Sequence, residues 1–203
     1  MALKKYEIDM CNGSILPKLL KFSLPLMLSS VLQLLFNAAD IIVVGNFASE
    51  HSLAAVGSTT ALINLITNLF LGLSTSSNVL SANYMGAGDD DRVSKTVHTS
   101  LLISVISGLI LTVIGIAFTE QMLIWMQTPE EVLNLSAIYL RIYFGGMVAM
   151  MIYNFGSALL RSKGDTKRPL YYLAFSGVIN IILNLIFVIC FNMDVAGVGL
   201  ATV

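Results

Sequence analysis

The chain has 203 residues, of which 56% are hydrophobic and 11% are charged, whereas a typical soluble domain carries about 25% charged residues. With 11 Lys and Arg against 12 Asp and Glu, the net charge of -1 provides no basic field of the kind that binds nucleic acid, so we expect no nucleic-acid partner. The composition excludes an ordinary soluble domain and predicts an all-α integral membrane protein whose first partner is the lipid bilayer.

Apolar stretches divide the chain into predicted membrane spans, because about 20 apolar helical residues cross a bilayer core about 30 Å thick. Five stretches predict complete transmembrane helices at about residues 16–46, 52–83, 92–119, 129–160 and 169–192. A short apolar segment at 195–203 predicts the incomplete start of a sixth helix. The domain prediction is therefore an N-terminal tail over residues 1–15 and one transmembrane lobe over residues 16–203.

Positive charges lie on one side of this helix plan. All but one of the 11 Lys and Arg residues lie ahead of the apolar run of the first helix, between the second and third apolar runs, or between the fourth and fifth, and the exception is Arg141. Because Lys and Arg concentrate in cytoplasmic loops, the pattern predicts a multi-pass protein of the plasma membrane with a cytoplasmic N-terminus. Arg141 is interpreted as an interfacial residue whose long side chain reaches the lipid headgroups.

One acidic residue, Asp40, falls within the apolar part of a predicted span. A carboxylate at the centre of a transmembrane helix costs roughly 2.5 to 3.5 kcal/mol on insertion scales, so it requires a partner, a water-filled cavity or a proton. Ser30, Gln33 and Asn37 project from the same side of the helix as Asp40, because residues three, four and seven apart share one helical face. This stripe is predicted to face away from lipid.

Two further predicted helices repeat the pattern. Asn64 and Asn68 belong to a polar stripe in the second helix, and Asn180 and Asn184 lie one turn apart in the fifth. Polar side chains of this kind also form hydrogen bonds between membrane helices, and each such bond contributes about 0.6 kcal/mol to stability on average. Because such bonds require no carboxyl group, three stripes that include Asp40 favour a polar cavity in which Asp40 exchanges a proton or a cation.

The segments PLMLSSVLQLLFNAADIIVVGNF and YLRIYFGGMVAMMIYNFGSALLRSKGDTKRPLYYL, with NIILNLIFV and VAGVGLATV after them, resemble the multidrug and toxic compound extrusion (MATE) transporters in order and spacing. The resemblance implies a twelve-helix fold of two six-helix lobes, of which this chain is the first. It also implies antiport: export of amphipathic, often cationic drugs or toxic compounds in exchange for protons or sodium ions, with no other cofactor. The C-terminal lobe of the same protein is then an expected partner.

The resemblance also implies a coupling site in this lobe. The family's acid in the first helix aligns with Asp40, its pair in the fifth helix with Asn180 and Asn184, and its threonine in the sixth with Thr202. Tyr139 aligns with a family tyrosine near that site. Asn184 departs from the pattern, because many members have Asp there. Asp40, Asn180, Asn184 and Thr202 still offer oxygen ligands for sodium, so both the proton and sodium remain open.

We interpret the polar stripes as a substrate cavity and Asp40 as its switch. Exchange of a proton or cation at Asp40 is expected to bias the bundle between outward-open and inward-open forms, with a bend of the first helix at Pro25. The expected lining consists of amide side chains among apolar and methionine side chains such as Met147 and Met151; the amides are Gln33, Asn37, Asn64, Asn68 and Asn154.

Three alternatives carry less support. A lipid-linked saccharide flippase of the same superfold is expected to have more basic residues in its cavity than this sequence offers. An intramembrane enzyme is not expected, because His51 and His98 are far apart and Cys190 has no adjacent base. The third alternative is a membrane fragment that does not transport, since half of a pseudo-symmetric transporter can insert without transporting.

Overall fold

The computed structural model describes Ile8 and residues 13–203, so most of the predicted N-terminal tail lies outside the described residues. The described chain is helical throughout and contains no strand, which confirms the all-α prediction. Three long helices come first, α1 (Ile15–Phe47), α2 (Glu50–Gly86) and α3 (Asp90–Trp125). After them come α4 (Glu130–Gly145), α5 (Met147–Ser162), α6 (Lys167–Leu185), the π-helical turn η1 (Ile186–Cys190) and α7 (Asp194–Thr202).

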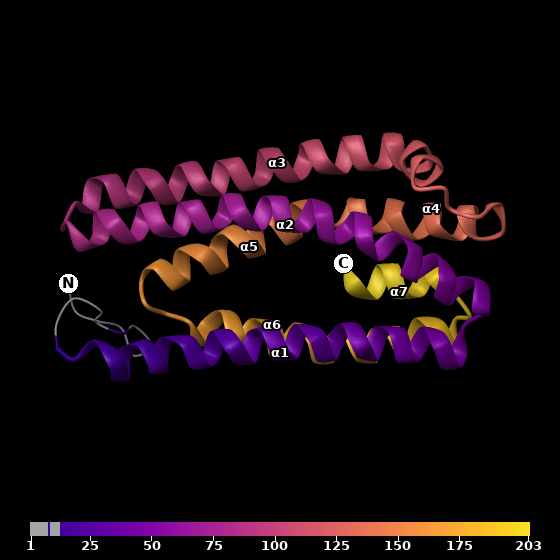
Figure 1. Ribbon diagram of the computed structural model, residues 1–203, viewed down its shortest axis with the longest axis horizontal. Coiled ribbons are helices and arrows are strands. Elements are labelled where there is room, and N and C mark those ends of the chain that lie inside the picture. The colour runs from indigo at the N-terminus through magenta and orange to yellow at the C-terminus, as the bar shows by residue number, and fades with distance from the viewer. Residues whose placement is uncertain (1–7, 9–12) are drawn as a thin grey trace.

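The helices form two groups that run nearly parallel to the long axis of the molecule (Figure 1). In one group α2 and α3 pack against each other and against both α4 and α5, whereas α1 packs along α6. The short α7 contacts α4 on one side and α6 on the other, and so joins the groups. Within the described residues, four helices are long and apolar enough to cross a membrane, or five if α4 and α5 make one span.

The predicted fourth span, 129–160, is wrong as a single helix. It is divided at Gly146 into α4 and α5, whose axes differ by 50°. Gly145 and Gly146 break the helix because glycine is about 1 kcal/mol less favourable than alanine in a helix interior. At the break, Thr112 of α3 donates its hydroxyl to the carbonyl oxygen of Phe144 at 2.8 Å.

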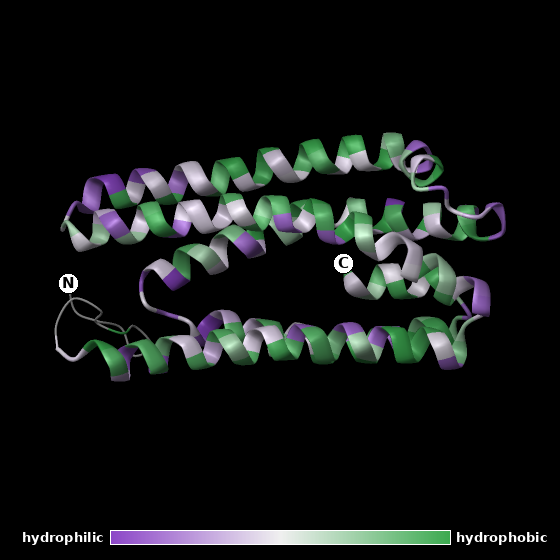
Figure 2. Ribbon diagram, in the orientation of Figure 1, coloured by the Kyte–Doolittle hydropathy of each residue, from purple (hydrophilic) through white to green (hydrophobic). Residues whose placement is uncertain are grey.

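Hydrophilic residues gather where α2 meets α3 and α5 meets α6, and apolar residues cover the middle of the bundle (Figure 2). Except for Arg141, every Lys and Arg of the described residues lies at this end of the bundle, where α1, α3 and α6 begin. There Asp89 caps α3 by accepting the backbone N–H of Arg92 at 3.0 Å. Arg141, at the other end, lies 2.6 Å from Glu120, so an ion pair accompanies the interfacial position predicted for it.

The interior around the break is tightly packed. Phe144, Met147 and Met151 have no exposed surface and pack together with Leu123 of α3. A Cβ atom on Gly115 would overlap the ring of Phe144, so glycine is what allows α3 to approach α4 closely. Met147 and Met151 therefore do not line an accessible cavity, contrary to the prediction, because the bend between α4 and α5 turns both side chains into the core.

Candidate functional site

The close packing of α1 against α6 positions the first part of the site. The ring of Phe36 in α1 lies where a Cβ atom of Gly177 in α6 would be, so the absence of a side chain at Gly177 lets the helices approach. One turn further along α1, the Asp40 carboxylate accepts a hydrogen bond from Nδ2 of Asn184 at 2.5 Å. The acid in the apolar part of the first predicted span and an amide 144 residues later in the chain are thus in direct contact.

Asn180 and Thr202 extend the contact into a network. Nδ2 of Asn184 also donates to Oδ1 of Asn180 at 3.2 Å, because the two residues are one turn apart on α6. Asn180 in turn donates to the carbonyl oxygen of Ala201 at 3.1 Å and, at 3.5 Å, to the hydroxyl of Thr202. These four predicted residues, Asp40, Asn180, Asn184 and Thr202, therefore meet at the contact of α1, α6 and α7.

One oxygen atom of this network stands out. Asn184 is 0% exposed, and its Oδ1 has no hydrogen-bond partner among the described residues. Buried amide oxygens nearly always have a partner, so a buried acceptor without one is an expected place for a proton donor or a cation. Among the described residues no group of three or more His, Cys, Asp or Glu side chains is placed to hold a metal ion. The network itself contains one carboxylate, that of Asp40, among the neutral oxygens of Asn180, Asn184 and Thr202.

Tyr139 lies close to the network without joining it. The side chain is buried in an apolar cluster that contains Val43 and Val44 of α1 and Val198 of α7. Its ring is 6.4 Å from the ring of Tyr143, and no hydrogen bond connects it to Asp40 within the described residues. Tyr139 therefore forms part of the packed wall beside the network.

The predicted substrate residues are less closely grouped. Gln33 and Asn37 are exposed on α1, Asn64 and Asn68 are exposed on α2, and Asn154 is half-buried on α5. Helices α1 and α2 diverge from their connection (Figure 1), so these amides do not contact one another. Two hollows, of 460 Å³ beside α2 and 330 Å³ between α2 and α3, contain none of the five.

Two contacts near the site were not foreseen from the sequence. At one end of the bundle, Ser52 of α2 donates its hydroxyl to Asp194 of α7 at 2.7 Å. Next to Thr202, the side chain of Val203 occupies the space that a Cβ atom of Gly146 would fill. The tandem Gly145 and Gly146 is the one sequence signal for the second contact, because such pairs mark helix breaks as well as close approaches.

Comparison with known proteins identifies the family. The MatE family model matches residues 25–186. Over 195 residues the chain is 29% identical to the probable multidrug resistance protein YpnP of Bacillus subtilis, covering 96% of this chain and 44% of the relative. Over 162 residues it is 38% identical to the probable multidrug resistance protein YoeA of the same bacterium, covering 80% of this chain and 35% of the relative.

The fold agrees with that assignment. A solved structure described as the outward-facing conformation of a multidrug resistance MATE family transporter of the MOP superfamily superimposes with a TM-score of 0.91 at 27% identity, covering 100% of this chain and 44% of the solved one. The chain thus spans less than half the length of the curated relatives it matches. On the evidence of the family match, the relatives and the fold, the chain belongs to the MatE family of multi-pass membrane transporters.

Proposed function

We propose that the chain forms the first lobe of a secondary antiporter that exports amphipathic, often cationic compounds in exchange for protons or sodium ions. Two relatives are named multidrug resistance proteins, and the chain covers 44% and 35% of them. Coverage of that extent agrees with one lobe of a two-lobe transporter. The second lobe of the same protein is then the partner with which this lobe encloses a substrate.

The hydrogen bond from Asn184 to Asp40 is the observation that carries this proposal. In its ionised form Asp40 accepts this bond, so Asn184 stabilises the empty, charged state of the site. In its protonated form Asp40 becomes a donor, and the unpartnered Oδ1 of Asn184 is then available to accept after rotation of the amide. A proton therefore changes the contacts between α1 and α6.

A sodium ion uses the same atoms differently. The Asp40 carboxylate, the Oδ1 atoms of Asn180 and Asn184, and the Thr202 hydroxyl supply four oxygens, which are the ligands that hard cations prefer. Either ion neutralises the Asp40 carboxylate. The two coupling ions differ in whether Asn180 and Thr202 contribute.

Occupation of the site is transmitted through α7. Thr202 contacts Asn180 in the network, and the next residue, Val203, packs against Gly146 at the break between α4 and α5. An ion shifts a conformational equilibrium only through different affinities for the two states. Displacement of Thr202 on ion binding provides this difference in affinity, because it changes how the Val203 side chain packs against Gly146 at the break between α4 and α5.

The substrate is proposed to bind on the open faces of α1 and α2. Gln33 and Asn37 on α1, and Asn64 and Asn68 on α2, are exposed where the two helices diverge. Amides among apolar side chains give an adaptable surface for compounds that are apolar with a polar end. Asn154, half-buried on α5, is proposed as a further amide that contacts the substrate.

The test compares two acid-to-amide variants of the complete gene product in liposomes. Asp40→Asn keeps the shape of the side chain but removes its capacity to bind a proton or a cation, and we expect it to abolish efflux of a fluorescent cation driven by a proton or sodium gradient. Asp91→Asn, at an exposed position on α3, is the matched control and should transport normally. Full gradient-driven efflux by Asp40→Asn would remove Asp40 from the mechanism.

A further inference from the structure

A groove between the last turns of α2 and the first turns of α3 has no part in the proposed transport cycle. Its volume is 330 Å³, and its walls come from both helices. Tyr84 of α2 and Arg92 and Lys95 of α3 lie at its mouth, at the end of the bundle where the basic residues gather. No carboxylate contributes to its walls.

The chemistry of the groove changes in a regular order along α3. Arg92 and Lys95 come first, the hydroxyls of Thr99 and Ser100 follow about one turn deeper, and the apolar Ile103 ends the series. At 1.5 Å per helical residue the series extends over about 16 Å from Arg92 to Ile103. Positive charge, then hydroxyl groups, then apolar surface is the order that matches a phosphate, a glycerol ester and an acyl chain.

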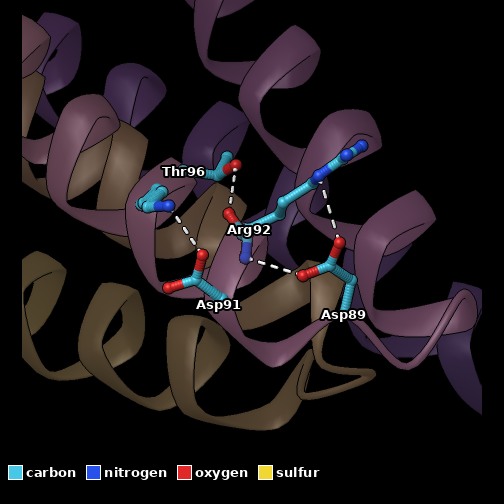
Figure 3. Close-up of polar contacts among 5 residues, drawn as sticks. Asp89, Asp91, Arg92 and Thr96 are labelled. Carbon is cyan, nitrogen blue, oxygen red and sulfur yellow. Dashed lines mark hydrogen bonds and ion pairs between the residues drawn. The ribbon is translucent and has the colours of Figure 1, made fainter.

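Arg92 and Lys95 retain hydrogen-bond donors that a ligand can use. Arg92 pairs with Asp89 through Nε alone, at 3.1 Å (Figure 3). Its guanidinium carbon lies 5.6 Å from the centre of the Tyr84 ring. Its two terminal nitrogens have no hydrogen-bond partner among the described residues. Lys95 uses one contact of 2.6 Å to Asp91. Because the side chains of Arg92 and Lys95 are 64% and 74% exposed, both ion pairs are weak and yield readily to a phosphate.

The hydroxyls deeper in the groove are also available. The side-chain hydroxyls of Thr99 and Ser100 make no hydrogen bond within the part of the chain that the structure describes. Thr96, by contrast, donates to the carbonyl oxygen of Arg92 at 2.8 Å (Figure 3). Thr99 and Ser100 can therefore donate to ester oxygens one to two turns below a phosphate.

We propose that this groove binds an anionic glycerophospholipid. The phosphate contacts Arg92 and Lys95, the ester oxygens contact Thr99 and Ser100, and one acyl chain lies along Leu80 and Ile103. This inference rests on the proposed orientation, in which this end of the bundle faces the cytoplasmic leaflet and its anionic lipids, and it is independent of Asp40. A choline headgroup fits poorly, because its positive charge approaches the same two basic side chains.

The test measures lipid binding by the complete gene product in detergent, using native mass spectrometry with phosphatidylglycerol, phosphatidylcholine or inorganic phosphate as the probe. We expect preferential binding of phosphatidylglycerol to the wild-type protein. The double variant Arg92→Gln/Lys95→Gln should bind phosphatidylglycerol about 30-fold more weakly, as expected for two basic groups at a membrane surface. The matched control Lys18→Gln/Lys21→Gln removes two cations, one half-buried and one exposed, from the start of α1 and should bind normally.

A second variant distinguishes a lipid from free phosphate and also covers a failure of the double variant to fold. Thr99→Phe fills the groove below the basic groups and should weaken phosphatidylglycerol binding without adding or removing charge. The proposal is overturned if Thr99→Phe or a folded Arg92→Gln/Lys95→Gln protein retains wild-type affinity for the lipid. It is also overturned if the control loses affinity equally, or if inorganic phosphate displaces the lipid.

Discussion

Replacing Asn184 by Asp tests the electrostatic basis of the coupling site. The variant places a carboxylate oxygen where Nδ2 of Asn184 now lies 2.5 Å from the Asp40 carboxylate, so two negative groups share the contact. Two unit charges about 4 Å apart repel by about 4 kcal/mol at an effective dielectric constant of 20. A proton or a cation between the carboxylates removes that repulsion.

This energy sets the size of the expected effect. Because 1.4 kcal/mol corresponds to a factor of ten in binding, 4 kcal/mol corresponds to an increase of up to about 1000-fold in affinity for the coupling ion. Half-maximal ion-driven efflux from liposomes should therefore occur at a far lower activity of the coupling ion in Asn184→Asp than in the wild-type protein. Separate titrations with protons and with sodium show which ion is responsible.

Asn134→Asp is the matched control, because Asn134 is exposed on α4 and its side chain makes no hydrogen bond with the described residues of the Asp40 network. It should have the ion dependence of the wild-type protein. The reasoning is refuted if Asn184→Asp folds, transports and keeps the wild-type dependence on both ions. An equal shift in Asn134→Asp would refute it as well, because the effect would then arise from net charge alone.

Two further predictions concern packing and orientation. Gly115→Ala should lower the thermal midpoint of the protein in detergent, because the new Cβ would overlap the ring of Phe144 and overpacking costs about 1–3 kcal/mol. Gly72→Ala is the control and should not lower the midpoint, because a Cβ at Gly72 meets nothing within 4 Å. Equal effects of the two variants would contradict the packing of Gly115 against Phe144. In a Cys11→Ser background, the exposed thiol of Cys190 should react with a membrane-impermeant maleimide added to intact cells. Labelling that occurs only after the cells are permeabilised would contradict the predicted orientation.

Local features of the sequence were sufficient to predict the helices. A span is recognised from about 20 consecutive apolar residues, and the end of a helix from the few residues around it. The predicted range 16–46 corresponds to α1 at Ile15–Phe47, and the acidic turn before α3 caps that helix through Asp89. The predicted helix 129–160 is instead divided at Gly146. Two adjacent glycines lower the stability of a helix, but whether the helix breaks there also depends on how it packs against α3 and α7, which the local sequence does not show.

The resemblance to MATE transporters, and not composition or periodicity, was what brought Asp40, Asn180, Asn184 and Thr202 together as one candidate site. Periodicity assigned each residue to a face of its own helix but contained no information on which faces meet. Their contact depends on α1 packing along α6 at Gly177 and on α7 turning back against both. The amides expected to line a cavity show the same limit, since Gln33 and Asn64 lie on helices that diverge.

The sequence by itself determined that this chain resides in a bilayer, roughly where most of its helices begin and end, and that one carboxylate lies among apolar residues. Those properties depend on the transfer of short segments from water to lipid and on local hydrogen bonds. Only the tertiary structure decided that Asn184 donates to Asp40, that Met147 is buried and that Val203 seats at Gly146. Each of those contacts joins residues of different helices, and their positions follow from how all the helices pack together.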